Sequence, residues 1–369
     1  MNENTNLLYL KIKKNLVEKL RTIGPNERIP SRNELMKEYN VTRTTVDRAI
    51  SELIGEGYLY SRDGSGTFAA ENAAAVNRQE NGKIINWGMI LPNIMHDTYP
   101  GILRGVEDVA NKHGRNTVIC NTDNINEKQA NYIYKLVESG IEGAVIVPAI
   151  TDEIDVRPFK MLQERNIPFV FCNRGINGIV APAVISNSFY GGYIATKHLI
   201  KQGFRKIAYI SNPMYQVSLD RYQGYRSAIE EAGIDAGDEY VYFAESFLVE
   251  KNGYENTKLL LKRNPEVDAI FCFNDAIAQS AFQAITEAGL KVGRDIGLVG
   301  YDNTNLCESL PVKLTSVKFK TQEIGTKAAE LLLNIINGEN VQKNKRIVLQ
   351  PELVVRESCG SQRDKNEAV

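Results

Sequence analysis

A cluster of hydrogen-bonding side chains stands at residues 42–45, where the sequence reads Thr-Arg-Thr-Thr. The guanidinium of Arg43 can donate two parallel hydrogen bonds to a guanine, and the threonines suit phosphate oxygens or a thymine methyl group. These groups could therefore read double-stranded DNA, provided that an element carries them into the major groove. The first turn of a helix does this in DNA-binding helix-turn-helix units.

The residues before this cluster predict two of the helices that such a unit needs. Apolar residues recur at every fourth position from Leu8 to Leu20, with lysines between them, which indicates an amphipathic helix. Ser31 and Glu34 have the spacing of a capping box, so a short second helix should begin at Ser31. This helix should bury its apolar side chains, Leu35, Met36 and Tyr39.

A third helix should follow the turn at Asn40 and Val41. Thr42 can cap this helix, and Gly57 suits the position just after its end. Its apolar positions lie on one stripe, formed by Val46, Ala49, Ile50 and Leu53. Two short strands should follow, at 58–60 and 67–69, around the glycine-rich turn at 64–66.

Helix, helix-turn-helix and hairpin in this order resemble the winged-helix domain of the GntR family. The resemblance rests on five motifs in register between Pro30 and Phe68, namely P-S-x-x-E-L, V-T-R-T-T-V, A-I-x-x-L, E-G-Y-L and G-S-G-T-F. It implies DNA contacts from the start of the second helix, from the recognition helix and from the wing. The expected DNA-binding residues are Arg32, Asn33, Thr42, Arg43, Thr44, Thr45, Asp47, Arg48, Gly64, Ser65 and Gly66.

Two positions depart from the family pattern. Many members carry a basic residue at the position of Asn33, and many carry Arg or Lys at that of Asp47. Asp47 either accepts a hydrogen bond from a cytosine or excludes other sequences, so the operator cannot be copied from relatives. In the alternative interpretation, Arg43 and Arg48 are solvated helix charges and residues 64–66 form an ordinary hairpin turn.

The rest of the chain has a different pattern of apolar and polar residues. Residues 70–83 are small and polar and indicate a flexible tether. After them, short β-branched runs alternate with helical stretches, which predicts βαβ units and parallel sheets covered on both faces. Strands are expected at 84–91, 117–120, 143–147 and 169–172, and again at 207–210, 240–243, 269–273 and 296–301. Helices are expected near 100–113, 127–138, 157–165, 220–232, 252–263 and 275–288.

The repeated rhythm indicates two lobes, with sites at the carboxyl ends of the strands that face a cleft between the lobes. The predicted fold class is α/β. The predicted organisation is a winged helix-turn-helix in residues 1–70, a linker in 71–83, a two-lobed domain in 84–358 and a tail in 359–369.

The two-lobed region resembles the ligand domain of lac-repressor-like regulators and of sugar-binding periplasmic proteins. Matching motifs run almost without a gap and include G-I-L-R-G-V-E from Gly101, G-A-V-I-V-P from Gly143, R-Y-x-G-Y from Arg221 and V-G-Y-D from Val299. The resemblance implies a periplasmic-binding-protein-like (type I) fold of doubly wound parallel sheets. Its fusion to a GntR-type head is the arrangement of arabinose-repressor-like regulators.

A polyol in such a cleft needs charged and amide groups with fixed directions, plus an apolar surface for a C–H face of the ring. The resemblance implies that Arg221 donates to two vicinal hydroxyls and that polar groups just past the strands accept from others. The expected ligand-binding residues are Asp97, Thr98, Tyr99, Asn173, Arg174, Arg221, Asn274, Asp275, Asp302 and Phe319.

Several of these residues have structural alternatives. In the alternative interpretation, Asp275 has only a structural role as the cap of the helix that follows it, and Asp302 likewise only helps to form a turn. Arg174 could form a salt bridge at the hinge, and Tyr99 could pack against its own loop. Trp87, within the first strand, is expected in the core.

Composition narrows the class of protein. The chain has 44 Lys and Arg against 45 Asp and Glu over 369 residues, and residues 1–70 hold 11 against 9, a mild positive excess at the DNA-binding end. No signal-peptide pattern or membrane-spanning apolar run is present, so we expect a cytoplasmic protein without a membrane partner. The five cysteines lack C-x-x-C spacing and are expected to be reduced structural thiols.

No sequence motif indicates catalysis. The three histidines are widely separated, and the phosphate-binding and Gly-x-Ser-x-Gly motifs are absent from the sequence. We therefore expect no enzyme, no metal and no cofactor.

The sequence predicts a DNA-binding transcriptional regulator, a repressor of a sugar-utilisation operon. Its expected partners are an operator duplex, a second copy in a homodimer, and a sugar effector such as arabinose or a similar pentose or hexose. The alternatives are a solute-binding protein and a ligand-activated co-repressor with a non-sugar effector. The sequence leaves open whether ligand loosens or tightens DNA binding.

Overall fold

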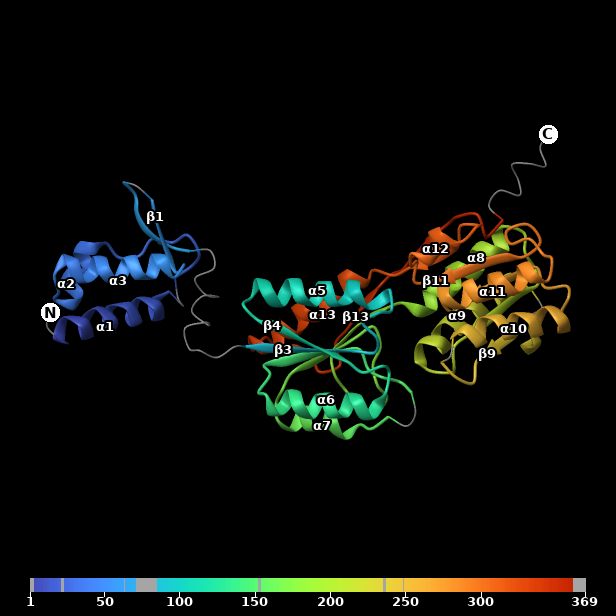
Figure 1. Ribbon diagram of the computed structural model, residues 1–369, viewed down its shortest axis with the longest axis horizontal. Coiled ribbons are helices and arrows are strands. Elements are labelled where there is room, and N and C mark those ends of the chain that lie inside the picture. The colour runs from blue at the N-terminus through green and yellow to red at the C-terminus, as the bar shows by residue number, and fades with distance from the viewer. Residues whose placement is uncertain are drawn as a thin grey trace. The chain divides into compact units, whose positions relative to one another are not determined.

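The computed structural model describes residues 3–20, 23–62, 64–70, 85–151, 154–234, 237–247 and 249–360. The chain separates into two compact units, one of residues 1–86 with 110–116 and one of residues 87–109 with 117–369 (Figure 1). The predicted linker at 71–83 and most of the predicted tail lie outside the described residues. The predicted domain limits therefore stay predictions.

Apart from residues 110–116, which contain the end of one helix and the start of one strand and are described with the second unit, the described residues of the first unit form three helices and a two-stranded hairpin. The elements are α1 (Glu3–Lys19), α2 (Arg32–Tyr39), α3 (Arg43–Gly55), β1 (Leu59–Arg62) and β2 (Gly66–Ala69). Strand β1 pairs antiparallel with β2, with Leu59 opposite Ala69. The predicted apolar stripe of α3 is buried and packs with Ile12 and Leu16 of α1.

Local hydrogen bonds decide where α2 and α3 begin and end. Ser31 and Glu34 form the predicted capping box, and Asn40 ends α2 in a left-handed conformation with φ of 50°. Gly57, with φ of 79°, follows α3 as predicted. Thr42 does occupy the N-cap of α3, but its hydroxyl caps no backbone N–H because it bonds instead with the hydroxyls of Thr44 and Thr45.

The second unit contains two lobes, each built on a six-stranded sheet. Lobe 1 consists of β3 (Asn86–Leu91), α5 (Thr98–Lys112), β4 (Asn116–Asn121), α6 (Asn126–Glu138), β5 (Gly143–Ile146), α7 (Arg157–Glu164), β6 (Phe169–Cys172), β7 (Ala183–Ser186), α13 (Thr321–Ile336) and β13 (Arg346–Leu349). Its strand order is β13-β7-β6-β5-β3-β4. In Figure 1, α5 and α13 cover one face of this sheet, and α6 and α7 cover the other.

Lobe 2 repeats this plan. It consists of α8 (Ser188–Lys201), β8 (Ile207–Ser211), α9 (Gln216–Glu231), a 3-10 turn (Asp238–Tyr240), β9 (Val241–Phe243), α10 (Val249–Arg263), β10 (Ala269–Cys272), α11 (Asp275–Glu287), β11 (Gly297–Tyr301), α12 (Leu306–Ser309), β12 (Thr315–Lys318) and β14 (Glu352–Val354). Its strand order is β14-β12-β11-β10-β8-β9, in which only β14 runs antiparallel to its neighbour among the registers described.

Both sheets have the doubly wound order in which the first strand lies between the second and the third. The predicted α/β fold class is therefore confirmed. The chain alternation, however, predicted two successive halves of four strands, and the sequence pattern did not indicate β7, β13 and β14 as strands of the sheets. The chain crosses between the lobes three times, because α8, α13 and β14 each pack on the lobe opposite to the strand that precedes them.

Each lobe has its own apolar core between sheet and helices. Trp87 is fully buried in β3, as predicted, and its indole N–H donates to Glu142 at 2.8 Å. All five cysteines are free thiols and all are buried. Cys359, at the predicted start of the tail, belongs to the folded lobe, where its sulfur lies 3.1 Å from Nε2 of His198.

Candidate functional site

The first turn of α3 presents part of the predicted base-reading set. The side chain of Arg43 is 72% exposed, and Thr44 is exposed beside it. Thr45 is only 6% exposed, because it is the first residue of the buried stripe of α3. The prediction that Thr45 contacts DNA is therefore withdrawn, since its side chain faces the core of the winged helix.

Asp47 lies one turn further along α3 and contacts two arginines. Its Oδ1 accepts from Nε of Arg32 at 2.6 Å, and its Oδ2 lies 3.6 Å from Nε of Arg43. Arg48 points elsewhere, with an ion pair to Glu52 at 3.4 Å and its guanidinium 3.9 Å from the ring centroid of Tyr9. Asn33 is exposed at the start of α2.

The hairpin tip has the backbone of a tight turn. Gly64 and Gly66 have φ of 71° and 116°, and Ser65 N–H donates to Arg62 O at 3.0 Å. Two exposed cations that the sequence analysis did not single out flank this tip. Arg62 belongs to β1, and the guanidinium of Arg28 lies so close to Gly66 that a Cβ there would be 2.8 Å from its Nε.

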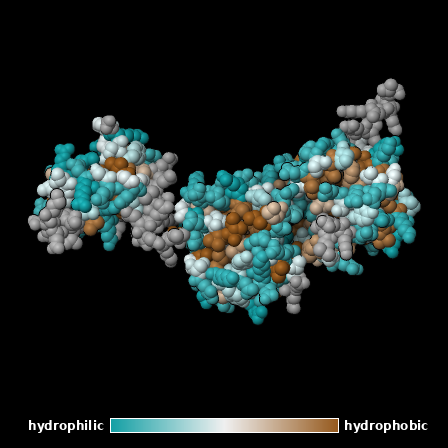
Figure 2. Space-filling model, in the orientation of Figure 1, coloured by the Kyte–Doolittle hydropathy of each residue, from teal (hydrophilic) through white to brown (hydrophobic). Residues whose placement is uncertain are grey.

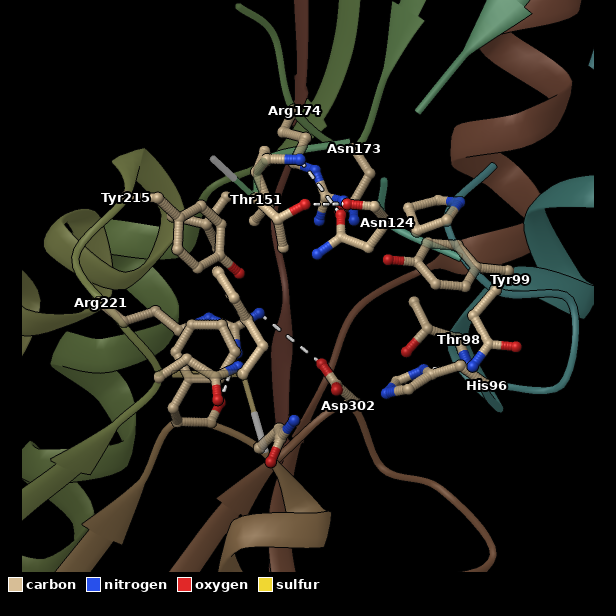
Figure 3. Close-up of a pocket in the computed structure, with 18 of the residues that line it drawn as sticks. His96, Thr98, Tyr99, Asn124, Thr151, Asn173, Arg174, Tyr215, Arg221 and Asp302 are labelled. Atoms are coloured by element: carbon tan, nitrogen blue, oxygen red, sulfur yellow. Dashed lines mark hydrogen bonds and ion pairs between the residues drawn. The ribbon is translucent and has the colours of Figure 1, made fainter. Parts of the chain in front are cut away.

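A pocket of about 380 Å³ lies between the two lobes (Figure 3). It is lined by eight of the predicted ligand-binding residues, Thr98, Tyr99, Asn173, Arg174, Arg221, Asn274, Asp302 and Phe319. The other lining residues are Pro92, Asn93, His96, Asp123, Asn124, Ile150, Thr151, Asn212, Tyr215, Val217, Phe247 and Phe273. Neither Asp97 nor Asp275 is among the residues that line it.

The topology explains why these residues meet. Most of them directly follow a strand, and the carboxyl ends of parallel strands share one edge of a sheet. In Figure 3 the residues of lobe 1, such as Asn173 and Tyr99, and those of lobe 2, such as Tyr215 and Arg221, face one another across a central space. The same rule could have identified Asn124, Thr151 and Asn212 from the sequence.

Arg221 is the most deeply placed charged group of the pocket. Its side chain is 7% exposed, and its Cζ lies 3.4 Å from the ring centroid of Tyr301 and 4.2 Å from that of Phe273. One terminal nitrogen donates to the carbonyl of Phe273, whereas the buried Nε has no hydrogen-bond partner among the residues that the structure describes. A bound ligand can supply the hydrogen-bond acceptor that the unsatisfied N–H of this buried guanidinium lacks.

Close helix packing sets the position of Arg221. A Cβ at Gly192 of α8 would lie 2.2 Å from the carbonyl oxygen of Arg221, and one at Gly224 of α9 would lie 2.0 Å from Phe189 O. The two backbones can approach this closely only because both residues lack a side chain. Helix α9 is therefore held directly against α8 at the turn that carries Arg221.

Asp302 faces Arg221 from the loop after β11. Its Oδ1 lies 3.6 Å from Nη2 of Arg221, and its own backbone has φ of 100°. Burial raises the pKa of Asp302 to about 7, against the opposing effect of Arg221. This carboxyl group can therefore change its charge near neutral pH.

Asp275 holds this loop instead of lining the pocket. Its carboxylate accepts from the N–H of Thr304 at 2.7 Å and from Ser316 Oγ at 2.6 Å. Asn274, and not Asp275, provides the N-cap of α11, because its Oδ1 accepts from Ile277 N–H at 2.9 Å. Asp275 is thus removed from the expected ligand contacts and assigned to positioning the loop of Asp302.

The lobe 1 wall is a network of amides and hydroxyls. Asn173 has φ of 65°, and Nε of Arg174 donates to the carbonyl of Pro148 at 2.8 Å. Asn124 accepts from Ile150 N–H at 3.1 Å, and its own carbonyl accepts from the hydroxyl of Thr151. These bonds fix the directions of the polar groups before any ligand binds.

Aromatic rings supply the apolar part of the pocket. The ring of Tyr215 lies 5.9 Å from Phe247 and 6.0 Å from Phe273, measured between centroids. Phe319 is buried, and its ring centroid lies 6.2 Å from that of Tyr301. On the opposite wall Tyr99 packs 5.5 Å from His96, whose pKa is lowered by burial, so that this imidazole is neutral at pH 7.

Within the described part of the chain, no three His, Cys, Asp or Glu side chains gather in a way that could hold a metal ion. Nor does any described helix have the length and apolar character to span a membrane.

Comparison with known families gives two matches. Residues 8–69 match the model of bacterial regulatory proteins of the gntR family, and residues 196–359 match that of a periplasmic binding protein-like domain. A DNA-reading head on a lobed ligand pocket defines the class of ligand-controlled transcriptional regulators.

The relatives place the chain within that class. It is 28% identical over 365 residues to an arabinose metabolism transcriptional repressor of Halalkalibacterium halodurans, covering 97% of each chain. It is 31% identical to the HTH-type transcriptional repressor PurR of Actinobacillus pleuropneumoniae, covering 73% of this chain and 80% of that one. The chain belongs to the HTH-type transcriptional regulators that join a gntR-family head to a periplasmic binding protein-like domain.

Solved structures agree with the fold. A complex of the transcriptional regulator CelR with cellobiose superimposes with a TM-score of 0.67 at 26% identity, covering 89% of this chain and all of that one.

Proposed function

We propose that this protein represses a sugar-utilisation operon and releases its operator when an unphosphorylated pentose or hexose binds between the lobes. The observation that carries the proposal is the polar pocket around Arg221, whose buried Nε has no hydrogen-bond partner in the described part of the chain and would gain one from a bound sugar. The likeness over nearly the whole chain to an arabinose metabolism repressor supports a small sugar as the effector.

The charges of the pocket favour a neutral polyol. Its lining holds two arginines, Arg174 and Arg221, and two aspartates, Asp123 and Asp302, so their formal charges cancel once Asp302, with its pKa of about 7, is ionised. Each arginine also donates one N–H to a backbone carbonyl, which leaves fewer donors for a ligand. A sugar phosphate would need an excess of cationic donors, whereas hydroxyls can both donate to the carboxylates and accept from the guanidinium groups.

The DNA contacts are proposed from the exposed residues of the winged helix. Arg43 and Thr44 would reach base edges in the major groove, and Arg32 and Asn33 would lie at the phosphate backbone. The wing tip at 64–66, flanked by Arg28 and Arg62, would contact the duplex beside the recognition helix. Arg48, paired within the head, is proposed at most as a phosphate contact.

A homodimer would match two operator half-sites about 34 Å apart. We propose the edge strand β4 of lobe 1 as part of its interface. β4 is the outermost strand of its sheet and exposes Val118 and Ile119 at 37% and 45%. Figure 2 shows a hydrophobic patch on this part of lobe 1. An exposed apolar edge strand favours pairing with a second chain.

Ligand would act by changing how the lobes of the two copies pack. The three chain crossings between the lobes would bend as the pocket closes around the sugar. A hundredfold loss of operator affinity requires a coupling free energy of only about 2.7 kcal/mol, which is within reach of a few ligand contacts.

Two measurements on the full chain test the proposal. Thermal unfolding with a panel of pentoses, hexoses and their phosphates should give a higher melting temperature with an unphosphorylated sugar. A duplex from the region upstream of the gene should bind in the absence of that sugar and be released in its presence. Stabilisation without duplex binding under any condition would instead indicate a solute-binding protein, and tighter duplex binding with ligand would indicate a co-repressor.

A further inference from the structure

We propose that Asp47 is a positioning residue for DNA specificity, which orients Arg43 and Arg32 and contacts no base itself. This inference rests on the proposed DNA-binding function of the head. It replaces the two interpretations that the sequence offered for an acid on the recognition helix, namely reading a cytosine and excluding other sequences.

The first observation is the contact with Arg32. Nε of Arg32, at the start of α2, donates to Oδ1 of Asp47 at 2.6 Å, which is a short, charge-assisted hydrogen bond. Nη1 of the same guanidinium lies 3.3 Å from Oγ1 of Thr67, a buried residue of β2. Asp47 therefore joins the recognition helix to α2 and, through Arg32, to the wing.

The second observation is the contact with Arg43. Asp47 follows Arg43 by four residues on α3, so the two side chains lie on the same face, and their Nε and Oδ2 atoms are 3.6 Å apart. Arg43 is the most exposed member of the cluster, at 72%, and would otherwise sample many rotamers. A carboxylate one turn below restricts its guanidinium to directions from which both terminal nitrogens stay available for a base.

The occupied carboxylate argues against direct base reading. Both oxygens of Asp47 already face guanidinium groups, so an approach to a cytosine amino group would break these contacts. The acid also lowers the net positive charge of the surface that meets phosphates. Asp47 thus weakens sequence-independent binding while it orders the arginine that discriminates.

The test compares Asp47→Asn with the wild-type full chain. Selection from a duplex library with a randomised core gives an enriched duplex, and an unrelated duplex of the same length serves as the non-specific probe. We expect Asp47→Asn to bind the unrelated duplex more tightly and to lose about tenfold in the ratio of the two affinities. The variant's own selection should lose preference at the guanine read by Arg43.

Glu52→Gln is the matched control. Glu52 also lies on α3 and is paired with Arg48 and with Lys13 of α1, so this change removes one negative charge from the same helix without touching Arg32 or Arg43. It should strengthen binding to both duplexes alike and leave their ratio unchanged. Arg32→Gln provides a second way to break the link and should also lower the ratio. The Arg32–Asp47 pair is only partly buried, so Asp47→Asn and Arg32→Gln should each lower the melting temperature by no more than a few degrees.

Three outcomes overturn the inference. If Asp47→Asn loses preference at a single cytosine and nowhere else, Asp47 reads that base directly. If its affinity ratio changes no more than that of Glu52→Gln, Asp47 acts only through its charge. If the wild-type chain enriches no duplex, the proposed DNA-binding function itself fails, and the inference fails with it.

Discussion

Arg221 and Asp302 meet inside the pocket with Nη2 and Oδ1 3.6 Å apart, although both side chains are less than a tenth exposed. This distance is too long for a strong hydrogen bond, so two buried charges face each other without fully satisfying each other. A ligand whose hydroxyls lie between them would satisfy the remaining hydrogen bonds of both groups. The pair therefore gives the sharpest tests of the proposed sugar site.

Arg221→Lys should lower sugar affinity by about ten- to a hundredfold while the chain stays folded. Lysine keeps the positive charge opposite Asp302 but lacks the planar fork that donates to two vicinal hydroxyls. Isothermal titration calorimetry with the sugar that stabilises the wild type measures the loss. Arg226→Lys is the control, because Arg226 lies on the same helix and pairs with Glu230 outside the pocket lining. Equal affinity in both variants would contradict the role of Arg221.

Sugar affinity should rise with pH across neutrality. Burial raises the pKa of Asp302 to about 7, and a sugar that donates hydrogen bonds to the carboxylate favours its charged form. The dissociation constant at pH 6 should therefore exceed that at pH 8, by up to about tenfold. Burial lowers the pKa of His96 below its ordinary value of 6.5, so this imidazole is mostly neutral at pH 7 and contributes little to the change between pH 7 and pH 8.

Asp302→Asn should abolish this pH dependence, and an unchanged slope in the variant would contradict the assignment. The sign for stability is opposite. The folded-state pKa of Asp302 lies above its ordinary value of 3.8, so its contribution to the free energy of unfolding is complete below pH 4 and is lost as the pH rises through about 7.

Ile119→Lys should convert the proposed dimer into monomers. The substitution places a charge on the exposed apolar edge of β4, where a second chain would otherwise exclude water. Sedimentation analysis would measure the change, and operator affinity should fall about a hundredfold because the two heads are no longer linked.

Val348→Lys is the matched control for this substitution. Val348 is 44% exposed on β13, which forms the opposite edge of the same sheet. Its substitution by lysine should leave the oligomeric state unchanged. Dissociation by Val348→Lys but not by Ile119→Lys would move the interface to the other edge.

The cysteines should be unreactive in the folded chain. Burial raises the pKa of the thiol of Cys120 to about 11 and that of Cys307 to about 12, and it raises those of Cys172 and Cys272 further. A thiol reagent at pH 8 should label none of the five within minutes, and all five after unfolding in guanidinium. Rapid labelling of one thiol in the folded chain would show that its lobe opens locally.

The features that the sequence determined are those that depend on near neighbours. The capping box of Ser31 and Glu34 needs only residues three apart, and the stripe of α3 follows from the period of a helix. Residues 169–172 form β6 with the predicted limits, because a short apolar run before a polar pair is sufficient to mark a buried strand. Family motifs extended this local information to eight residues that line the pocket.

Only the tertiary structure decided which side chains reach the functional surfaces. Thr45 stands beside Arg43 in the sequence but belongs to the core, and Asp275 stands beside Asn274 but bonds to the loop that carries Asp302. The lobes are interleaved because α13 returns to lobe 1 after β12, which no local period records. Side-chain direction and burial depend on what packs against a residue from distant parts of the chain, and for this protein those contacts separate the residues that hold loops and helices in place from those that line the pocket.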